Sequence, residues 1–350
     1  MYAGLVATLE NFDGWPGTLG ALQRNDDLTG EHTQAVLDVI LAGEATEAQI
    51  AAFITGLRQK GETVEELTGL VRAMRKVSTP LHVPDHAIDI VGMGGSPSRH
   101  KAALNVSTMA SFVAAGAGAT VLKHGNRKAS STSGSFDLLE ALGVNFDVTP
   151  AKLEEIVAEV GLGFAFAPTY HSAMRHVGPV RKQLGIPTVF NALGPLANPA
   201  GVSRQVVGVS DTSLGERMIQ VLQATGSVFA WVVTGEGSLD EISPGPTAIH
   251  QLLDGKISSF TLDPAGYGIS TPPDGALDGG DAQANAAIAH RIFAGETGPI
   301  RDVISLNAAA GLMVAGVAEN FADALDRAGE SLDSGAAAAK LDGLIAASKN

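Results

Sequence analysis

Apolar residues recur at helical spacing in the N-terminal part of the chain. In TEAQIAAFITGLRQKG, which begins at Thr46, they occur every three or four positions, a Thr and a Gln fit a capping box, and Gly61 follows as a stop. A second segment of the same kind begins at Thr63, and Pro80 and Pro84 beyond it disfavour further helix. This pattern predicts a lobe made of helices.

After Pro84 the pattern changes to short apolar runs that alternate with Ala-rich helical segments. The runs are AIDIVG, ATVLK, GFAFAP, RQVVGVS and FAWVVTG. Strand, helix, strand order favours parallel pairing. We therefore predict an α/β fold with a small N-terminal helical domain over residues 1–79, joined by helices from about 170–190. A large α/β domain over residues 80–350 would contain a central, mostly parallel sheet.

Composition excludes several classes of protein. With 350 residues, 45% of them hydrophobic and 17% charged, the chain can bury a substantial core. Its formal net charge of -14 disfavours nucleic acid and anionic lipid as partners. The lack of Cys excludes disulfides, zinc-thiolate sites and a Cys nucleophile. The chain shows neither a signal-peptide pattern nor an apolar run of about 20 residues, so no membrane segment is expected and the cytoplasm is the predicted location.

The first predicted strand is followed by a stretch that is suited to anions. Open parallel sheets bind ligands at the carboxyl ends of their strands. The stretch GMGGSPSRHKAALNVST, residues 92–108, has glycines that let the backbone approach a phosphate, and a helix is expected to start near Ser107. A Gly-rich turn before a helix is also a common structural device, so this stretch alone leaves both interpretations open.

The second strand end is richer in donors. Lys123, His124, Asn126 and Arg127 follow the strand directly, and hydroxyls come next in the chain, from Ser130, Ser131, Ser133 and Ser135. The alternative is a solvated loop in which Ser133 or Ser135 caps the following helix. Two such loops at neighbouring strand ends favour a phosphorylated ligand.

Two further stretches add charged groups. Asp240 and Glu241 stand side by side after FAWVV, where they form either an exposed turn or a Mg²⁺ site completed by substrate oxygens. The stretch from 166 to 199 carries His171, Arg175, His176 and Arg181 in a predicted helix, and Arg181 is suited to pair with a carboxylate ligand. No nucleophile elbow or Walker A motif competes with these, so the residues alone predict a Mg²⁺-dependent enzyme acting on a phosphorylated small molecule.

Together these stretches resemble the anthranilate phosphoribosyltransferase family. KHGNR with the following serines, GS-D-LEALG, FAP-YH-AM, PVR--LG, T-FN-LGPL-NP, LDE, DAQANA and LNAAA occur in family order and cover nearly the whole chain. The related nucleoside phosphorylases share the architecture but differ in the KHGNR loop. The resemblance implies transfer of the phosphoribosyl group of phosphoribosyl pyrophosphate (PRPP) to anthranilate in tryptophan biosynthesis, with Mg²⁺ as cofactor and a homodimer as the assembly.

The resemblance also implies roles for individual residues. PRPP would contact Gly92, Gly94, Gly95, Asn105, Ser107, Thr108, Lys123, Ser131 and Ser135. Anthranilate would face Gly92, His124, Asn126 and Arg181, and Mg²⁺ would be held by Ser107, Asp240 and Glu241. No catalytic general base is expected, because an aromatic amine is a usable nucleophile and the protein's task is positioning and charge stabilisation.

The chain departs from the family pattern at two places. The family's GTGGD loop is here Gly92-Met93-Gly94-Gly95-Ser96, and the stretch up to Asn105 is three residues longer. The second departure is TGEGSLDE, where the family has HG before the acidic pair and Gly in place of Ser238. Two alternative functions stay open: a non-enzymatic relative that binds nucleic acid, and phosphoribosyl transfer to another aromatic acceptor.

Overall fold

The computed structural model describes residues 7–94, 103–128 and 132–349. Two of its N-terminal helices begin where the sequence predicts. α3 (Glu47–Lys60) starts after Thr46, whose hydroxyl accepts from the backbone of Gln49, and α4 (Val64–Lys76) starts after Thr63 in the same way. The other members of this lobe are η1 (Leu9–Phe12), α1 (Gly14–Gln23) and α2 (Gly30–Ala42).

A seven-stranded sheet forms the centre of the molecule, in the order β3-β2-β1-β4-β5-β6-β7. The first five strands are parallel, and β6 and β7 are antiparallel to their neighbours in turn. The strands are β1 (Ile88–Gly92), β2 (Val121–Gly125), β3 (Leu162–Phe166), β4 (Arg204–Gly208), β5 (Phe229–Thr234), β6 (Thr247–Leu253) and β7 (Lys256–Leu262). The predicted fold class, a helical lobe followed by a mostly parallel α/β lobe, is confirmed.

The hairpin of β6 and β7 was absent from the sequence prediction. Its two strands are joined at Asp254 and Gly255, which both have positive φ, 49° and 74°. An Asp-Gly pair between alternating strands is typical of a tight hairpin turn, so the signal was present in the sequence. The hairpin covers the edge of β5 and leaves the site end of the sheet to the parallel strands.

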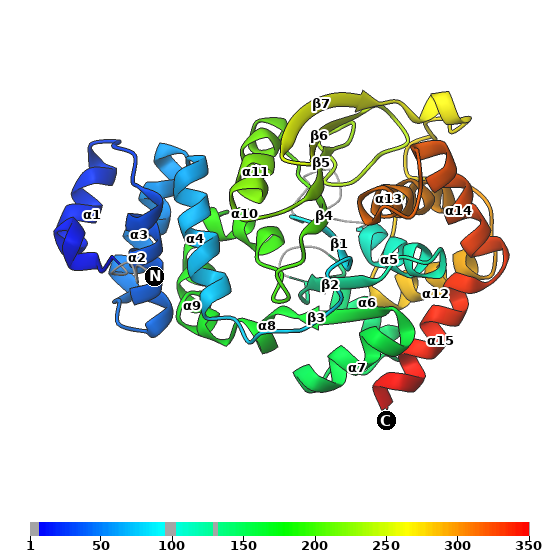
Figure 1. Cartoon of the computed structure of the whole chain (residues 1–350), viewed down its shortest axis with the longest axis horizontal. Helices are drawn as coiled ribbons and strands as arrows, with labels where there is room; N and C mark the ends of the chain where they lie inside the picture. The colour runs from blue at the N-terminus through cyan, green and yellow to red at the C-terminus, as the bar shows by residue number, and fades with distance from the viewer. Residues whose placement is uncertain (1–6, 95–102, 129–131, 350) are drawn as a thin grey trace.

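Helices cover both faces of the sheet (Figure 1). α5 (Val106–Gly116) and α13 (Pro299–Ala315) pack on one face, and α11 (Thr212–Ala224) packs on the other, next to α4. Because side chains alternate along a strand, Ile88 and Ile90 of β1 face the first core, whereas Val91 faces the core shared with the helical lobe. The remaining helices are α6 (Ser135–Ala141), α7 (Pro150–Val160), α12 (Ala282–Phe293), η4 (Pro264–Tyr267), α14 (Phe321–Asp333) and α15 (Ala336–Lys349).

The segment from 167 to 196 forms the predicted helical structure as several short helices, and His171 lies at the break between the first two. The pieces are α8 (Ala167–Tyr170), η3 (Ser172–His176), α9 (Gly178–Leu184) and α10 (Val189–Leu196). A Pro in the first turn of α8 and of α9 favours a new helix start at each place. The pieces contact α2, α3 and α4, as the position of α9 beside the blue helices shows (Figure 1).

Among the described helices, none combines the length and the apolar composition that a bilayer crossing requires. The domain limits at residues 79 and 80 stay a prediction.

Candidate active site

A cavity of about 720 Å³ opens at the carboxyl ends of the parallel strands. It is lined by the ends of β1 and β2 and by the turn after β5, on the two sides of the strand-order reversal between β1 and β4, which is the usual ligand position in an open α/β sheet. Twelve predicted site residues line it: Gly92, Gly94, Asn105, Ser107, Thr108, Lys123, His124, Asn126, Ser135, Arg181, Asp240 and Glu241. Gly95, Ser131 and the unusual Ser96 lie outside the described residues.

The glycine loop after β1 packs directly against the acidic turn after β5. The backbone N–H of Gly94 donates to Asp240 Oδ2 at 2.7 Å, and Gly94 has a φ of 69°, which favours glycine. A side chain at Gly92 would bring its Cβ to 2.5 Å from the same carboxylate oxygen. The glycines therefore make room for Asp240 as well as for a ligand.

The acidic turn is held from behind by α13. Asn307 accepts from the N–H of Ile242 and donates to the Ile242 carbonyl, both at 2.9 Å. This explains the LNAAA motif, to which the sequence analysis assigned no role. Ser238 of the same turn has a φ of 61°, a conformation that glycine adopts more easily.

The acidic pair fits a Mg²⁺ ion that shares its ligands with a substrate. In the described part of the chain no cluster of three or more His, Asp or Glu side chains is arranged to hold a metal by itself. Mg²⁺ usually takes one or two carboxylates and completes its shell with phosphate oxygens and water. Asp240 and Glu241 supply that number of carboxylates at the cavity wall.

α5 directs its first turn at the cavity. Ser107 and Thr108 belong to this turn, and helix N-termini attract anions. Asn105 precedes the helix without capping it, because its amide contacts Ser133 and accepts at 2.8 Å from Asn285 of α12. Asn285 comes from the DAQANA motif and joins α12 to the start of α5, a role that the sequence analysis did not assign.

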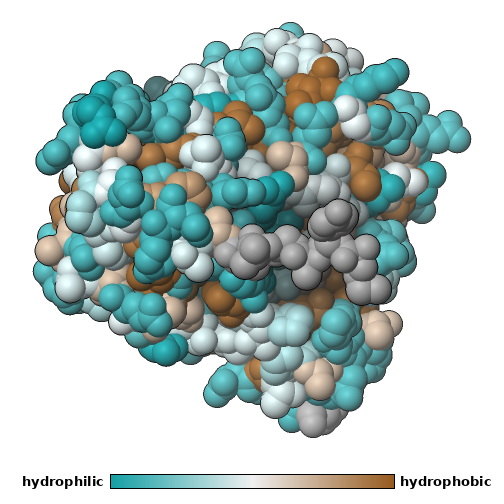
Figure 2. Space-filling model, turned by 60° about the vertical axis from the view of Figure 1, so that its left-hand side comes forward, coloured by the Kyte–Doolittle hydropathy of each residue, from teal (hydrophilic) through white to brown (hydrophobic). Residues whose placement is uncertain are grey.

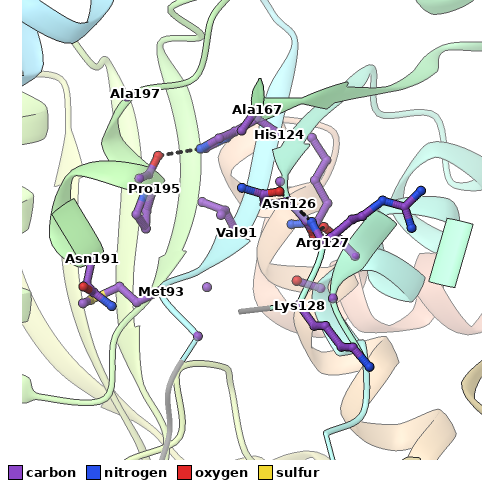
Figure 3. A pocket seen from close by; sticks show the side chains of 18 of the residues that line it. Val91, Met93, His124, Asn126, Arg127, Lys128, Ala167, Asn191, Pro195 and Ala197 are labelled. Atoms are coloured by element: carbon purple, nitrogen blue, oxygen red, sulfur yellow. Dashed lines mark hydrogen bonds between the residues drawn. The ribbon is translucent and has the colours of Figure 1, made fainter. Parts of the chain in front are cut away.

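Asn126 and Arg127, which follow β2, are bonded to side chains of α6. Ser135 Oγ donates to the Asn126 carbonyl at 3.1 Å. Arg127 makes two bonds to Glu140, at 2.8 and 3.0 Å, and this carboxylate raises the pKa of Arg127. Figure 3 shows the Arg127 guanidinium on the side of the pocket away from Met93. Arg127 therefore stabilises the loop.

The cap of α6 differs from the predicted alternatives. Gly134 is the N-cap, and Asp137 Oδ2 accepts from its N–H at 2.9 Å. Ser133 instead donates to Asn105 at 2.9 Å, so neither Ser133 nor Ser135 caps this helix. The Ser hydroxyls tie loops together around the cavity.

Two buried basic side chains, Lys123 and His124, belong to β2 itself. Lys123 is 3% exposed and donates to the Ile90 carbonyl at 2.6 Å. Burial lowers the pKa of Lys123, and the nearby carboxylates of Asp89, Glu241 and Asp240 act in the opposite direction. His124 contacts Asp89 through Nδ1, and its Nε2 lies 2.6 Å from the Gly194 carbonyl. Asp89 is fully buried in β1 and was not among the predicted site residues.

Arg181 lies against an apolar wall. Its guanidinium is 5.6 Å from the centre of the Phe190 ring and donates to Asn191 Oδ1 at 3.3 Å. Burial lowers the pKa of Arg181. Met93 and Asn191 lie on the same side of the pocket (Figure 3), and Met174 also lines it. An arginine beside methionines and a phenylalanine is suited to an aromatic acid.

His171 lines the cavity as a neutral ring. It is 7% exposed and its Nε2 donates to the Ala197 carbonyl at 2.8 Å. Burial lowers the pKa of His171 to about 4, and the nearby His124 acts in the same direction. His171 therefore carries no charge near neutral pH.

The cavity concentrates basic groups in an acidic chain. Lys123, His124, Arg127, Lys128, Arg175 and Arg181 all line it, against two carboxylates, whereas the whole chain has a formal charge of -14. Figure 2 shows a mainly hydrophilic face with a recess near its centre. This local excess of basic groups favours an anionic ligand in the cavity. The acidic net charge of the chain disfavours a polyanion elsewhere on the surface.

Comparisons with known proteins agree in both lobes. Residues 18–78 match the helical bundle domain of the glycosyl transferase family, and residues 84–338 match its a/b domain. The chain is 49% identical over 322 residues to an anthranilate phosphoribosyltransferase of Rhodopseudomonas palustris strain TIE-1, covering 92% of this chain and 94% of the relative. A Nocardioides sp. protein of the same name is 47% identical over 339 residues, covering 95% and 98%.

Solved structures give the same picture. The anthranilate phosphoribosyltransferase of Thermus thermophilus superposes with a TM-score of 0.90 at 39% identity, covering 95% of this chain and 99% of that one. The Saccharomyces cerevisiae enzyme in complex with PRPP and Mg superposes with a TM-score of 0.87 at 28% identity, covering 96% and 98%.

Proposed function

The chain belongs to the anthranilate phosphoribosyltransferases of the glycosyl transferase family, and from this membership we propose what it catalyses. It transfers the phosphoribosyl group of PRPP to the amine of anthranilate, a step of tryptophan biosynthesis, and releases pyrophosphate. The observation that carries the proposal is the cavity at the strand-order reversal, where a glycine loop, an acidic pair and buried cations meet.

PRPP is assigned to the part of the cavity between β1 and α5. Its phosphates and ribose would lie against Gly92, Gly94 and the first turn of α5, with Lys123 beneath them. Asn105 and Ser135 would act there mainly through the loops that they connect, because both side chains bond to protein groups.

Mg²⁺ would be held by Asp240, Glu241 and Ser107 together with oxygens of PRPP. When bound, it would neutralise the leaving pyrophosphate and fix its orientation. The Saccharomyces cerevisiae neighbour solved with PRPP and Mg supports this assignment.

Anthranilate is assigned to the side of the cavity lined by Arg181, Phe190 and Asn126. The guanidinium of Arg181 would bind the carboxylate, and Phe190 with Met174 would contact the ring. The Saccharomyces cerevisiae enzyme has also been solved with 4-fluoroanthranilate, which supports an aromatic acid as acceptor.

The proposed reaction displaces pyrophosphate from C1 of PRPP by the anthranilate amine, with inversion at that carbon. The protein positions the two substrates and surrounds the developing charge with fixed cations and helix N–H groups. No side chain needs to act as a general base before the attack, since the neutral aromatic amine is the nucleophile. The amine loses its extra proton to water or to the released pyrophosphate once the C–N bond has formed.

Turnover with PRPP, Mg²⁺ and anthranilate, followed by the loss of anthranilate fluorescence, tests the proposal. We expect product only when all three are present. Consumption of a different aromatic acid but not of anthranilate would support phosphoribosyl transfer to another aromatic acceptor. Salt-sensitive DNA binding without PRPP turnover would support the nucleic-acid alternative, which the acidic net charge disfavours.

Asp240→Asn is expected to lower turnover at limiting Mg²⁺ by about a hundredfold, the scale of one lost preorganised electrostatic contact. The Tm should change little, because Asp240 is half-buried at the cavity wall and not in a core. Asp342→Asn on α15 is the matched control, since this exposed carboxylate does not line the cavity. Undiminished turnover of the Asp240 variant would contradict the assignment of the acidic pair to the metal site.

We also propose a homodimer in the cytoplasm and a helical domain over residues 1–79 with the segment from about 170–190 attached. Light scattering of the purified protein tests the dimer.

A further inference from the structure

The surroundings of His124 fix the protons on its ring. Nδ1 contacts Asp89 Oδ2, and Nε2 lies 2.6 Å from the carbonyl oxygen of Gly194. A carbonyl oxygen and an ionised carboxylate only accept hydrogen bonds, so beside a carboxylate at Asp89 each ring nitrogen would carry a proton. A ring with both nitrogens protonated is an imidazolium cation.

The neighbours of Asp89 are hydrogen-bond donors. Asn198 Nδ2 donates at 2.8 Å to the same oxygen that His124 contacts, and donors on a carboxylate stabilise its charge. The orientation of the Asn198 amide is fixed by backbone, because Nδ2 also donates to the Leu122 carbonyl and Oδ1 accepts from the Ala200 N–H. The cation of Lys123 lies close enough to Asp89 for a Coulombic interaction.

Asp89 and His124 are buried together, so the loss of either side chain would leave the other without its partner. Asp89 is fully buried, and its Oδ1 has no hydrogen-bond partner among the described residues. A buried charge that loses its partner is strongly unfavourable. Asp89 therefore depends on its partners His124 and Asn198, and it adjoins the cavity through His124, which lines it.

We propose that Asp89 is a positioning residue for the transfer reaction, and that it acts by holding His124 as a fixed imidazolium. His124 then serves the anionic substrates with its charge, because both of its N–H groups are used by the protein and neither is free to donate to a ligand or to transfer a proton. The inference rests on the proposed function and extends it to a residue in the middle of a strand.

Nitrogen NMR of the ring tests the first part without any substrate. With uniform ¹⁵N labelling and assignment through His124→Gln, both ring nitrogens of the wild-type protein should show bound protons at the pH of the assay. In Asp89→Asn the acceptor charge is lost, and one ring nitrogen should lose its proton. A wild-type ring with one unprotonated nitrogen would overturn the proposal.

Kinetics test the second part. Asp89→Asn should lower kcat/KM for anthranilate at least about tenfold, because the substrate loses a preorganised electrostatic contact with the ring of His124. In a His124→Gln background the same change should alter kcat/KM less than about twofold, because the residue it acts through is gone. Equal effects in both backgrounds would show that Asp89 acts independently of His124 and would overturn the proposal.

Glu66→Gln is the matched control for loss of a buried carboxylate. Glu66 is fully buried in the helical lobe, where it accepts from the N–H groups of Leu28 and Thr63. Glu66→Gln should lower Tm but keep the wild-type ring spectrum of His124 and the wild-type kcat/KM. If Glu66→Gln lowered kcat/KM as much as Asp89→Asn does, the effect of Asp89 would be explained by stability alone. If both ring nitrogens of His124 carry protons but the protein does not turn over anthranilate, only the proposed function is contradicted. If the His124 ring is neutral in a protein that turns over anthranilate, only this inference is contradicted.

Discussion

Arg181 and Lys182 are neighbours on α9, but only Arg181 lines the cavity. Arg181→Ala should raise KM for anthranilate about tenfold or more and change KM for PRPP much less, because the lost partner is the acceptor carboxylate. Lys182→Ala, at an exposed position, should leave both constants unchanged. Steady-state kinetics with each substrate varied in turn makes the comparison. An equal increase for both substrates would assign Arg181 to the structure of the 167–196 segment.

His171 predicts how stability responds to acid. Burial lowers its pKa from the ordinary 6.5 to about 4. Between these two pH values His171 binds a proton in the unfolded chain but not in the folded protein. Stability should therefore fall as pH falls from about 6.5 to about 4, by roughly 3 kcal/mol from this residue. Urea unfolding at several pH values measures the slope.

His171→Gln separates this contribution from other titrations. A glutamine amide can still donate to the Ala197 carbonyl but does not titrate, so the variant should show a shallower loss of stability across the same window. Identical slopes for the two proteins would mean that His171 takes up its proton in the folded state.

At the scale of elements, α13 places the acidic turn. Asn307→Ala would leave the backbone groups of Ile242 without their partners, at a cost of about 1–3 kcal/mol for each buried group left unsatisfied. We expect a lower Tm and a higher Mg²⁺ concentration for half-maximal activity, because Asp240 and Glu241 directly precede Ile242. Thermal unfolding and Mg²⁺ titration of activity measure the two effects.

Asn320→Ala is the control for general destabilisation. Asn320 caps α14 through the N–H of Asp323, and loss of such a cap costs about 1 kcal/mol. Its variant should lose stability while keeping the wild-type Mg²⁺ dependence. The same Mg²⁺ shift in both variants would mean that α13 has no specific role in the site.

Local signals explain which elements were predictable. Caps such as Thr46 and apolar runs such as β1 act over a few residues, so the sequence was sufficient to predict the helical lobe and the parallel strands. The break at His171 was missed because two prolines start new helices within a pattern that was still helical. The β6–β7 hairpin was missed despite its Asp-Gly turn.

The supporting residues of the site were not predictable in the same way. Asn198 contacts Asp89 across 109 positions of sequence, and Asn285 contacts Asn105 across 180. No local periodicity relates such distant positions, and a single Asn or Asp in a sequence is compatible with an ordinary structural role. Polar groups at strand ends, together with the family resemblance, led to the cavity-lining residues, whereas the residues that hold them required the folded chain.

At the scale of the whole molecule, one apolar core crosses both lobes. Ile40 and Leu70 of the helical lobe belong to the same cluster as Val207 and Val232 of the sheet. We therefore expect one cooperative unfolding transition. The two Trp residues of the chain, Trp15 in α1 and Trp231 in β5, report on different lobes, and each can be followed alone after replacing the other by Phe.

Coincident fluorescence transitions in Trp15→Phe and Trp231→Phe would confirm the single unit. Arg75→Met should lower both midpoints together, since Arg75 of α4 donates to the carbonyls of Leu196 and Thr225 and so joins the lobes. Separate transitions would mean that the helical lobe unfolds independently of the sheet.

The support that Asn307 gives to the acidic turn also sets an order in time. A chain emerging from the ribosome exposes the glycine loop, the KHGNR loop and the acidic pair long before α13 is available. Until residue 307 has emerged, Ile242 has no partner from α13 to hold the turn in place. The growing chain therefore completes its substrate pocket only after α13 has been synthesised, and a ribosome that stalls before α13 leaves behind a sheet without a finished active site.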